Sequence, residues 1–262
     1  MKIIDFFHFP TSIKDENNLL QLKANEIKNY ISNIKNNNDT KYVFPIFSPK
    51  VIKEYQFCKL LENKRNTNNF YYLYMPDFNK NIKNQISLIK KIGFIGIVIH
   101  PYIQNIDNRL YDKLDTLINA CENKKLFISV CAAYGSSKMY KYYPLKIVSH
   151  IAERFSREII IIHGGGLKIM ESLLLAESYK NIYLETSFSL NYWSESSLIA
   201  DYAYVFKKIG SKRIIFGSDN PFMPYSESKN FLKNLLKKNK FTNSQINNIF
   251  FNNANNLLLK YE

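Results

Sequence analysis

The chain is poor in cysteine and histidine, and this scarcity limits the kinds of site that it can hold. Among its 262 residues there are only three cysteines and four histidines. The cysteines, Cys58, Cys121 and Cys131, form no CxxC pair and are odd in number, which argues against a disulfide framework. We therefore expect a disulfide-free protein of the cytoplasm.

Several motifs that would identify an activity are also missing. No apolar run reaches the roughly 18 residues that a membrane helix needs, so we expect no membrane partner. The HExxH, Walker and GxSxG motifs do not occur, which disfavours zincins, P-loop enzymes and esterase-type serine hydrolases. The segment 163–166 (HGGG) precedes a helical stretch. This segment has two equally good interpretations: an anion site built from backbone N–H groups, or simply a tight turn between a strand and a helix.

Acidic residues are too few to balance the basic ones. The chain has 22 Asp and Glu against 36 Lys and Arg, a net charge of +14. Such a charge suits nucleic acid, an acidic membrane surface or an anionic substrate. Lysine and asparagine, however, recur throughout, as in 35–38 (KNNN) and 237–240 (KKNK), which indicates a composition bias on solvated faces. No nucleic-acid-binding module accompanies the charge, so a nuclease is only a remote alternative. We expect a small anionic substrate as the partner. A homodimer stays open.

Hydrophobic residues, at 46 %, are abundant enough to bury a large core. They recur in eight short runs separated by amphipathic stretches such as 109–124, in which apolar residues fall at helical spacing. Runs such as 158–163 (EIIIIH) are apolar throughout, as strands buried on both faces require, and this predicts a parallel sheet. The predicted strands are 2–8, 41–47, 69–75, 94–100, 126–131, 158–163, 182–187 and 213–218.

Eight strand–helix units without a linker predict a single-domain α/β protein, a (β/α)8 TIM barrel over residues 1–262. A doubly wound open sheet is the alternative. The stretch 241–261 is predicted to be a closing helix, with four apolar residues packed inward: Ile246, Ile249, Phe250 and Leu257.

Polar side chains at the predicted strand ends mark the candidate active site, because barrels of this kind carry it at the C-terminal ends of their strands. In chain order these residues are Asp5, His8, His100, Cys131, His163, Glu185 and Asp219. Each alone is explained by a loop hydrogen bond or a helix cap. The barrel, however, brings His163 and Asp219 to one mouth, so we predict these two as catalytic residues, with His100 as a helper. The fourth histidine, His150, falls in a helical stretch and is expected to be an outer residue.

Six segments match one known family in their order along the chain. They are 3–6 (IIDF), 93–97 (GFIGI), 162–165 (IHGG), 181–187 (NIYLETS), 216–222 (FGSDNPF) and 252–258 (NNANNLL). Together they resemble the amidohydrolase superfamily, specifically its amidohydrolase-related branch with decarboxylases of aminocarboxymuconate semialdehyde type and pyrone-dicarboxylate lactonases. The GSDNPF segment, close to the family's GSDxPF, is the most specific match. The resemblance implies a TIM barrel with hydrolase or decarboxylase activity.

The resemblance also implies a metal centre, from which this sequence departs. The family's ligands are an HxH pair after the Asp of the first strand, a His on the fifth strand, often a His on the sixth, and an Asp on the eighth. In this chain the HxH positions fall on Phe7 and Phe9, and the fifth-strand position falls on Cys131 or a neighbouring alanine. Only His163 and Asp219 match.

A catalytic zinc normally needs three protein ligands and a water. We therefore predict a degenerate metal site and expect no cofactor. The alternative is a single divalent ion such as zinc held by a rearranged set drawn from His163, Asp219, His100 and Cys131.

Without a metal, a general base must activate water by itself. Asp219 is the predicted base, because desolvation near Phe7 and Phe9 would raise its pKa, and His163 is predicted to orient the water or to polarise a carbonyl. The predicted reaction is hydrolysis of a carbon–oxygen or carbon–nitrogen bond, most readily in an activated lactone or ester. The predicted substrate-binding residues are Phe7, His8, Phe9, Cys131, Glu185 and Lys138.

Two alternatives to this activity stay open. One is a catalytically inactive barrel that acts as a binding or assembly protein, which explains Phe7 and Phe9 most directly. The other is a metal-dependent hydrolase or decarboxylase with the rearranged ligand set.

Overall fold

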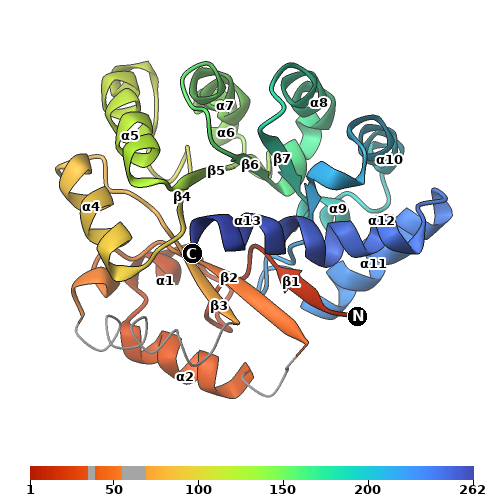
Figure 1. Ribbon diagram of the computed structural model, residues 1–262, viewed down its shortest axis with the longest axis horizontal. Helices are drawn as coiled ribbons and strands as arrows, with labels where there is room; N and C mark the ends of the chain where they lie inside the picture. Colours follow the sequence, from red (N-terminus) through yellow and green to blue (C-terminus); the bar gives the residue numbers. More distant parts are fainter. Residues whose placement is uncertain (35–38, 55–68) are drawn as a thin grey trace.

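The computed structural model describes residues 1–34, 39–54 and 69–262, and its eight strands form one parallel sheet (Figure 1). Each strand pairs with the next one in the chain. This sequential order is that of a TIM barrel and excludes the doubly wound alternative, in which the order reverses. The strands are β1 (Ile3–Asp5), β2 (Thr40–Ile46), β3 (Phe70–Tyr74), β4 (Gly96–Ile99), β5 (Phe127–Cys131), β6 (Ile159–Ile162), β7 (Ile182–Glu185) and β8 (Ile214–Ile215).

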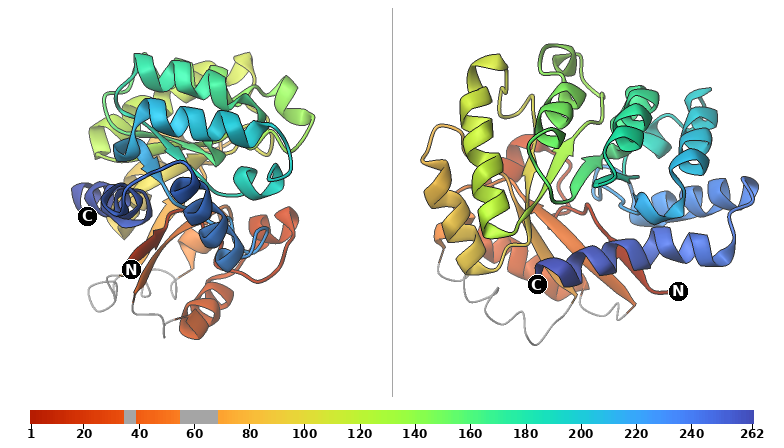
Figure 2. Two further views of the ribbon diagram at one scale, coloured as in Figure 1. Left: turned by 90° about the vertical axis from the view of Figure 1, so that its right-hand side faces the viewer. Right: turned by 45° about the horizontal axis from the view of Figure 1, so that its top comes forward.

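Backbone hydrogen bonds join the first and last strands just beyond their regular ends. The N–H of Phe6 donates to the carbonyl oxygen of Phe216 over 3.0 Å, and the N–H of Asp219 donates to that of Phe7 over 2.7 Å. The sheet is thus curled so that β1 and β8 meet (Figure 2). The predicted barrel is confirmed, but several strands end earlier than predicted. His163 and Asp219, for example, both have a φ of 66° and leave the extended conformation.

Helices follow the strands and cover the outside of the sheet (Figures 1 and 2). Local signals set their ends: Asn81 caps α4 by accepting from the N–H of Asn84, and Gly93 ends it in the left-handed conformation. The α-helices are α1 (Glu16–Gln21), α2 (Ala24–Ile34), α4 (Ile82–Ile92), α5 (Tyr111–Lys124), α6 (Lys138–Lys141), α7 (Pro144–Ala152), α8 (Ile169–Ser178), α9 (Ser189–Tyr192), α10 (Leu198–Ile209), α11 (Tyr225–Lys238), α12 (Asn243–Asn247) and α13 (Asn253–Tyr261). The shorter turns are η1 (Val51–Lys53), η3 (Asn108–Leu110), η4 (His163–Lys168), η5 (Ser211–Arg213) and η6 (Asn248–Asn252).

Two apolar clusters hold the layers together. One fills the space between the sheet and the helices, and the other fills the barrel interior. Five strands each contribute a fully buried interior residue: Ile4, Val43, Leu73, Val98 and Ile160. Both faces of the strands are therefore buried away from solvent, which accounts for their continuous apolar sequences.

The last helix, α13, lies across the N-terminal end of the barrel. Its Tyr261 ring packs on Phe127 at the start of β5 with centroids 5.2 Å apart, and its hydroxyl donates to the carboxylate of Glu158, just before β6. All four residues predicted to pack inward are buried: Ile246, Ile249, Phe250 and Leu257. This end of the barrel is filled, so a site must lie at the other end.

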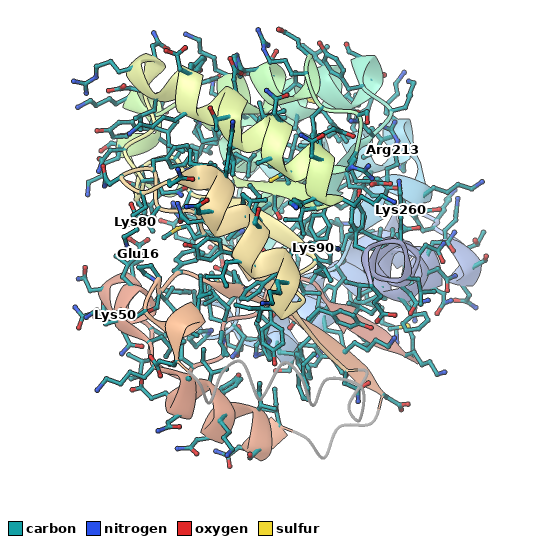
Figure 3. The ribbon with its side chains drawn as sticks, turned by 60° about the vertical axis from the view of Figure 1, so that its left-hand side comes forward. Glu16, Lys50, Lys80, Lys90, Arg213 and Lys260 are labelled. Carbon is teal, nitrogen blue, oxygen red and sulfur yellow. The ribbon has the colours of Figure 1, made fainter. Side chains whose placement is uncertain are left out.

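Charged side chains project from the outside of the molecule, as Lys50, Lys80 and Lys260 do in Figure 3. No helix in the described part of the chain has the length and apolar character needed to cross a membrane. His150 lies on the outer helix α7, 2.6 Å from a carboxylate oxygen of Asp115, as its helical sequence context predicted.

The described cysteines, Cys121 and Cys131, are both buried and free. Cys58 lies outside the described residues.

Candidate active site

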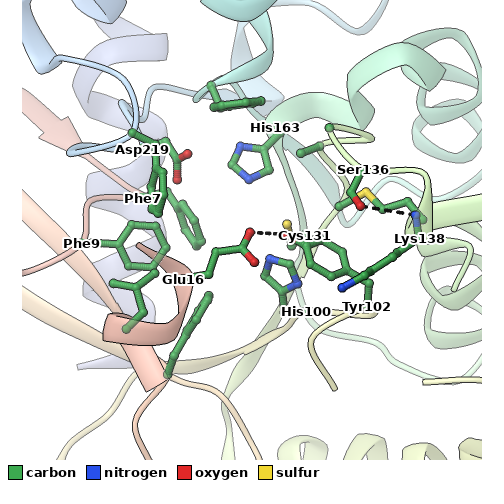
Figure 4. A pocket seen from close by; sticks show the side chains of 17 residues that line it. Phe7, Phe9, Glu16, His100, Tyr102, Cys131, Ser136, Lys138, His163 and Asp219 are labelled. Atoms are coloured by element: carbon green, nitrogen blue, oxygen red, sulfur yellow. Dashed lines mark hydrogen bonds between the residues drawn. The ribbon is translucent and has the colours of Figure 1, made fainter. Parts of the chain in front are cut away.

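A pocket of about 280 Å³ opens where the strands end. Residues from the ends of β1, β4, β5, β6 and β8 converge on it (Figure 4), as the barrel topology predicts. Its volume is close to the lower limit for ligand pockets, which suits a small molecule. Seven of the predicted site residues line it: Phe7, Phe9, His100, Cys131, Lys138, His163 and Asp219.

Asp219 follows β8 and directs its carboxylate into the pocket (Figure 4). The side chain is only 6 % exposed, and no hydrogen bond to its carboxylate is found in the described part of the chain. Burial, reinforced by the nearby carboxylates of Glu185 and Asp5, raises the pKa of Asp219 well above its ordinary value. An unpaired carboxylate of raised pKa is suited to taking a proton from water.

His163 points into the same part of the pocket as Asp219 (Figure 4). Its Nδ1 lies 2.9 Å from Oγ of Ser187 and 3.2 Å from the carbonyl oxygen of Ser187. Because a carbonyl only accepts, we assign the ring proton to Nδ1, which leaves a lone pair on Nε2. Burial lowers the pKa of His163 to about 4, so the ring is neutral at pH 7 and Nε2 accepts hydrogen bonds.

Glu185 supports His163 from behind and does not line the pocket. Its carboxylate accepts from the backbone N–H of His163 at 3.0 Å, and from the N–H and hydroxyl of Ser187 at 2.8 and 2.7 Å. Burial raises the pKa of Glu185 to about 8, although these three donors act in the opposite direction. We predicted a substrate-binding role for Glu185, whereas the structure gives it contacts that hold His163 and Ser187.

His8 also lies outside the pocket lining, although we predicted that it binds substrate. Its Nδ1 is 2.8 Å from a carboxylate oxygen of Asp5, and its Nε2 is 2.7 Å from the hydroxyl of Tyr30. Ser218 donates its hydroxyl to the same Asp5 oxygen over 2.6 Å. The chain bends after β1 ends at Asp5, so His8 turns back to this buried cluster between β1 and β8.

Three residues form a further part of the wall. His100 packs edge-on against Tyr102 with ring centroids 4.4 Å apart, and burial lowers the pKa of His100 to about 3. The Tyr102 hydroxyl donates to the carboxylate of Glu16. Neither Tyr102 nor Glu16 was predicted. Their signals were a tyrosine two residues beyond the His100 strand end and a carboxylate in the segment after the first strand.

Cys131 and Lys138 complete the predicted lining. Burial raises the pKa of the Cys131 thiol, so it stays protonated and uncharged. Lys138 begins the short helix α6 and is exposed at the pocket. It is the one lysine or arginine among the described lining residues.

The HGGG segment forms the turn between β6 and α8. All three glycines have positive φ angles. A Cβ on Gly165 would lie 2.0 Å from Oγ of Ser172, and one on Gly166 would lie 1.8 Å from the carbonyl oxygen of Ala133. Close packing of a tight turn therefore accounts for the glycines.

The pocket residues do not fit the metal centre that the family resemblance implies. Within the described ranges, no three His, Cys, Asp or Glu side chains are grouped so that they could hold a metal ion. The ring of Phe7 lies edge-on to those of Phe9 and His163, with centroids 5.3 and 5.5 Å away. The Phe7 ring, with Phe9 packed behind it, thus takes up space beside His163 where further ligands would be required.

Comparison with known proteins gives a family and a fold. A family model described as Amidohydrolase matches residues 68–259. The structure is similar to an uncharacterised TIM-barrel protein of Bordetella bronchiseptica, with a TM-score of 0.72, 15 % identity and coverage of 100 % of this chain and 99 % of that one. No curated protein sequence matches the chain.

Two further structures are similar over nearly the full length. A probable 2-pyrone-4,6-dicarboxylic acid hydrolase of Acinetobacter baumannii has a TM-score of 0.64 and 16 % identity, covering 98 % of this chain and 99 % of that one. The 2,6-dihydroxybenzoate decarboxylase of Rhizobium has a TM-score of 0.63 and 13 % identity, covering 99 % of each chain. At these identities the likeness establishes the TIM-barrel fold alone.

Proposed function

The chain belongs to the amidohydrolase family, and from this premise we propose that it hydrolyses an activated ester or lactone in a small anionic substrate. The observation that carries the proposal is the pairing of Asp219 and His163 in one pocket wall. Asp219 has an unpaired carboxylate, and His163 has its proton committed to Ser187, so two proton acceptors face one small space.

The two acceptors suit a single water molecule. The water donates one of its hydrogens to the Asp219 carboxylate and the other to Nε2 of His163. A lone pair on the water oxygen is then free to attack a carbonyl carbon. Asp219 takes a proton as the new carbon–oxygen bond forms, and it returns that proton to the leaving oxygen as the ester bond breaks. Of the two roles predicted for His163, this tautomer favours orienting the water, because Nε2 carries no proton to donate to a carbonyl.

The remaining lining residues set the substrate class. Lys138 supplies a positive charge at the exposed side of the pocket, to which a substrate carboxylate would bind. His100 is neutral and is assigned as a helper. Phe7 and Phe9 provide an apolar wall that desolvates Asp219 and strengthens it as a base. A good leaving group is needed, since a carboxylate acting alone is a weak catalyst for ordinary amides.

A metal-dependent hydrolase or decarboxylase is not the function we propose, because the described residues do not offer the three ligands that such a site needs. A non-catalytic binding role has one specific observation in its favour, namely the aromatic residues Phe7 and Phe9 at the family's ligand positions. Against it, their rings leave a cavity open beside Asp219 and His163.

The test is turnover of a panel of lactones and aryl esters, each supplied with and without a carboxylate group, by enzyme prepared in the presence of a chelator. We expect Asp219→Asn to lower kcat/KM by roughly 100- to 10,000-fold, the usual range for loss of a general base. Asp115→Asn is the matched control, because it makes the same chemical change on a 42 % exposed outer side chain.

Equal rates for the wild type and Asp219→Asn would contradict the proposed base. If the wild type turns over no member of the panel but binds the corresponding carboxylic acids in calorimetry, the binding role replaces the hydrolase.

A further inference from the structure

A second pocket lies beside the active-site pocket, at the ends of β2, β3 and β4. It has a volume of about 240 Å³, which is similar to that of the first. Its wall comes from α1, from the segments that follow β2, β3 and β4, and from η3. The described lining residues are Leu20, Phe47, Pro49, Met75, Pro76, Asp77, Phe78, Asn79, Ile103, Gln104, Asn105 and Leu110.

The two pockets share one wall, and Phe47 is its centre. Phe47 lines both pockets. Two pairs of consecutive residues also belong to this wall. Leu19 lines the active-site pocket and Leu20 the second one, and Tyr102 and Ile103 are divided between the two pockets in the same manner. The Phe47 ring lies edge-on to Phe9 and to His100, with centroids 5.2 and 5.6 Å away. The Phe47 ring, flanked by these two pairs of residues, therefore forms the wall between the active-site pocket and the second cavity.

Two of the four polar side chains that line the second pocket, those of Gln104 and Asp77, are engaged with the protein itself. The Gln104 side chain accepts from the backbone N–H of His100 and donates to the carbonyl oxygen of Pro76, both at 2.6 Å. The Asp77 carboxylate accepts from the N–H of Asn79 and lies 2.9 Å from Nζ of Lys80. These bonds take up much of the hydrogen-bonding capacity of Gln104 and Asp77, whereas Asn79 and Asn105 are exposed.

The larger part of the surface that remains for a ligand is apolar. Met75 and Phe78 are buried core residues, and Leu20, Ile103 and Leu110 are half-buried. A small concave surface of this composition binds uncharged alkyl or aryl groups through the hydrophobic effect. No lysine or arginine lines this pocket within the described residues, whereas Lys138 lines the first.

We propose that the second pocket is a subsite for a short alkyl or phenyl group, which passes Phe47 while the anionic head of the same ligand occupies the active-site pocket. The ligand is thus amphiphilic, with a carboxylate at one end and an apolar tail at the other. The orientation of the head rests on the proposed function, whereas the tail subsite stands on the second pocket alone. Phe47 sets the chain length at which the tail reaches the subsite.

The experiment is calorimetric binding of straight-chain carboxylates of four to ten carbons and of the 1-alkanols of equal length, below their micellar concentrations. Affinity for both series is expected to rise roughly fourfold per methylene beyond the length that fills the first pocket, since each buried methylene adds a constant free energy. Ile103→Glu, which places a charge in the second pocket only, should abolish this gain. Leu88→Glu is the matched control on an exposed leucine of α4 and should keep it.

Phe47→Ala adds a second readout, because removal of the ring should let the gain begin at a shorter chain. The proposal is overturned if affinity does not depend on chain length, or if Ile103→Glu leaves the dependence unchanged while the variant melts as the wild type does. If alkanols show the gain and carboxylates bind no better than alkanols, the subsite stands and the anionic head of the proposed function fails.

Discussion

The backbone N–H of Asp219 donates a 2.7 Å hydrogen bond to the carbonyl oxygen of Phe7. Asp219 matches the family pattern, whereas Phe7 stands where that pattern has a histidine, and this contact joins the two. It also links the extensions of β1 and β8, so the bond that helps to close the barrel fixes the proposed base beside its apolar wall. Site geometry and barrel closure are therefore coupled in this protein.

The rate of hydrolysis should rise with pH. Asp219 acts as a base only when it is deprotonated, and burial raises its pKa well above the ordinary value of 3.8. His163 and His100 have pKa values lowered to about 4 and about 3, so neither changes charge in the same range. Glu185, whose pKa is raised to about 8, also titrates there and acts on Asp219. A profile of kcat/KM from pH 5 to pH 10 should therefore rise with pH, and a flat profile would contradict the assignment of the base.

Replacement of Asp219 should also change how stability depends on pH. A buried acid of raised pKa stabilises the fold fully below its ordinary pKa of 3.8, and this contribution is lost as the pH rises towards the folded-state pKa. The Asp219→Asn side chain does not ionise, so this variant does not lose stability in that way. Its free energy of unfolding should therefore fall less than that of the wild type between about pH 4 and pH 8 in urea titrations.

The Asp115→Asn protein is the control for this measurement, because Asp115 is half exposed and pairs with His150 on the surface. If Asp219→Asn and the wild type lose stability in parallel over this range, Asp219 is ionised in the folded state without strain, and the proposed pKa shift is wrong.

Gly166→Ala should destabilise the protein far more than Gly210→Ala. Both glycines have positive φ angles, 53° and 73°, with ψ angles of −128° and 165° that other residues avoid, so both variants incur backbone strain of about 1–3 kcal/mol. Only at Gly166 would the new Cβ overlap another group, the carbonyl of Ala133 at 1.8 Å, whereas nothing lies within 4 Å at Gly210. We expect Gly166→Ala to cost more than about 4 kcal/mol in denaturant unfolding, and equal losses would show that the turn relaxes easily.

Loss of His8 should weaken the fold more than loss of His150. His8 hydrogen bonds to the fully buried Asp5, whose carboxylate would lose a partner in His8→Asn, at a cost of about 1–3 kcal/mol. His150→Asn removes a bond to the exposed Asp115, worth about 0–1 kcal/mol. Denaturant midpoints of the two variants provide the comparison, and a reversed order would mean that Asp5 finds another partner.

Metal removal should leave the protein unchanged. The described residues offer no group of three ligands, so chelation followed by added zinc or manganese is expected to alter neither kcat nor the melting temperature. Near-stoichiometric zinc that disappears in His163→Ala would instead restore the rearranged ligand set of His163, Asp219 and His100.

The sequence alone determined the architecture and seven of the residues that line the pocket. Strand positions follow from short apolar runs, and buried parallel strands need such runs whatever their neighbours are. A barrel gathers all strand ends at one mouth, so His100, Cys131, His163 and Asp219 could be placed there without knowledge of any contact. Phe7 and Phe9 also line the pocket, at the positions that the family resemblance assigns to the HxH pair.

Only the tertiary structure decided which side chains face the cavity from the connecting segments. Glu16 and Tyr102 lie beyond their strands, and no periodic pattern fixes the direction of a side chain there. Glu185 ends β7 just as the other site residues end their strands, yet its carboxylate turns to the N–H groups of His163 and Ser187. That choice depends on hydrogen-bond donors supplied by a neighbouring segment, as do the tautomer of His163 and the wall that Phe47 makes between two pockets. Local sequence sets the period of a strand, whereas contacts between residues distant in the chain set the direction and the hydrogen-bond partners of the side chains at each strand end.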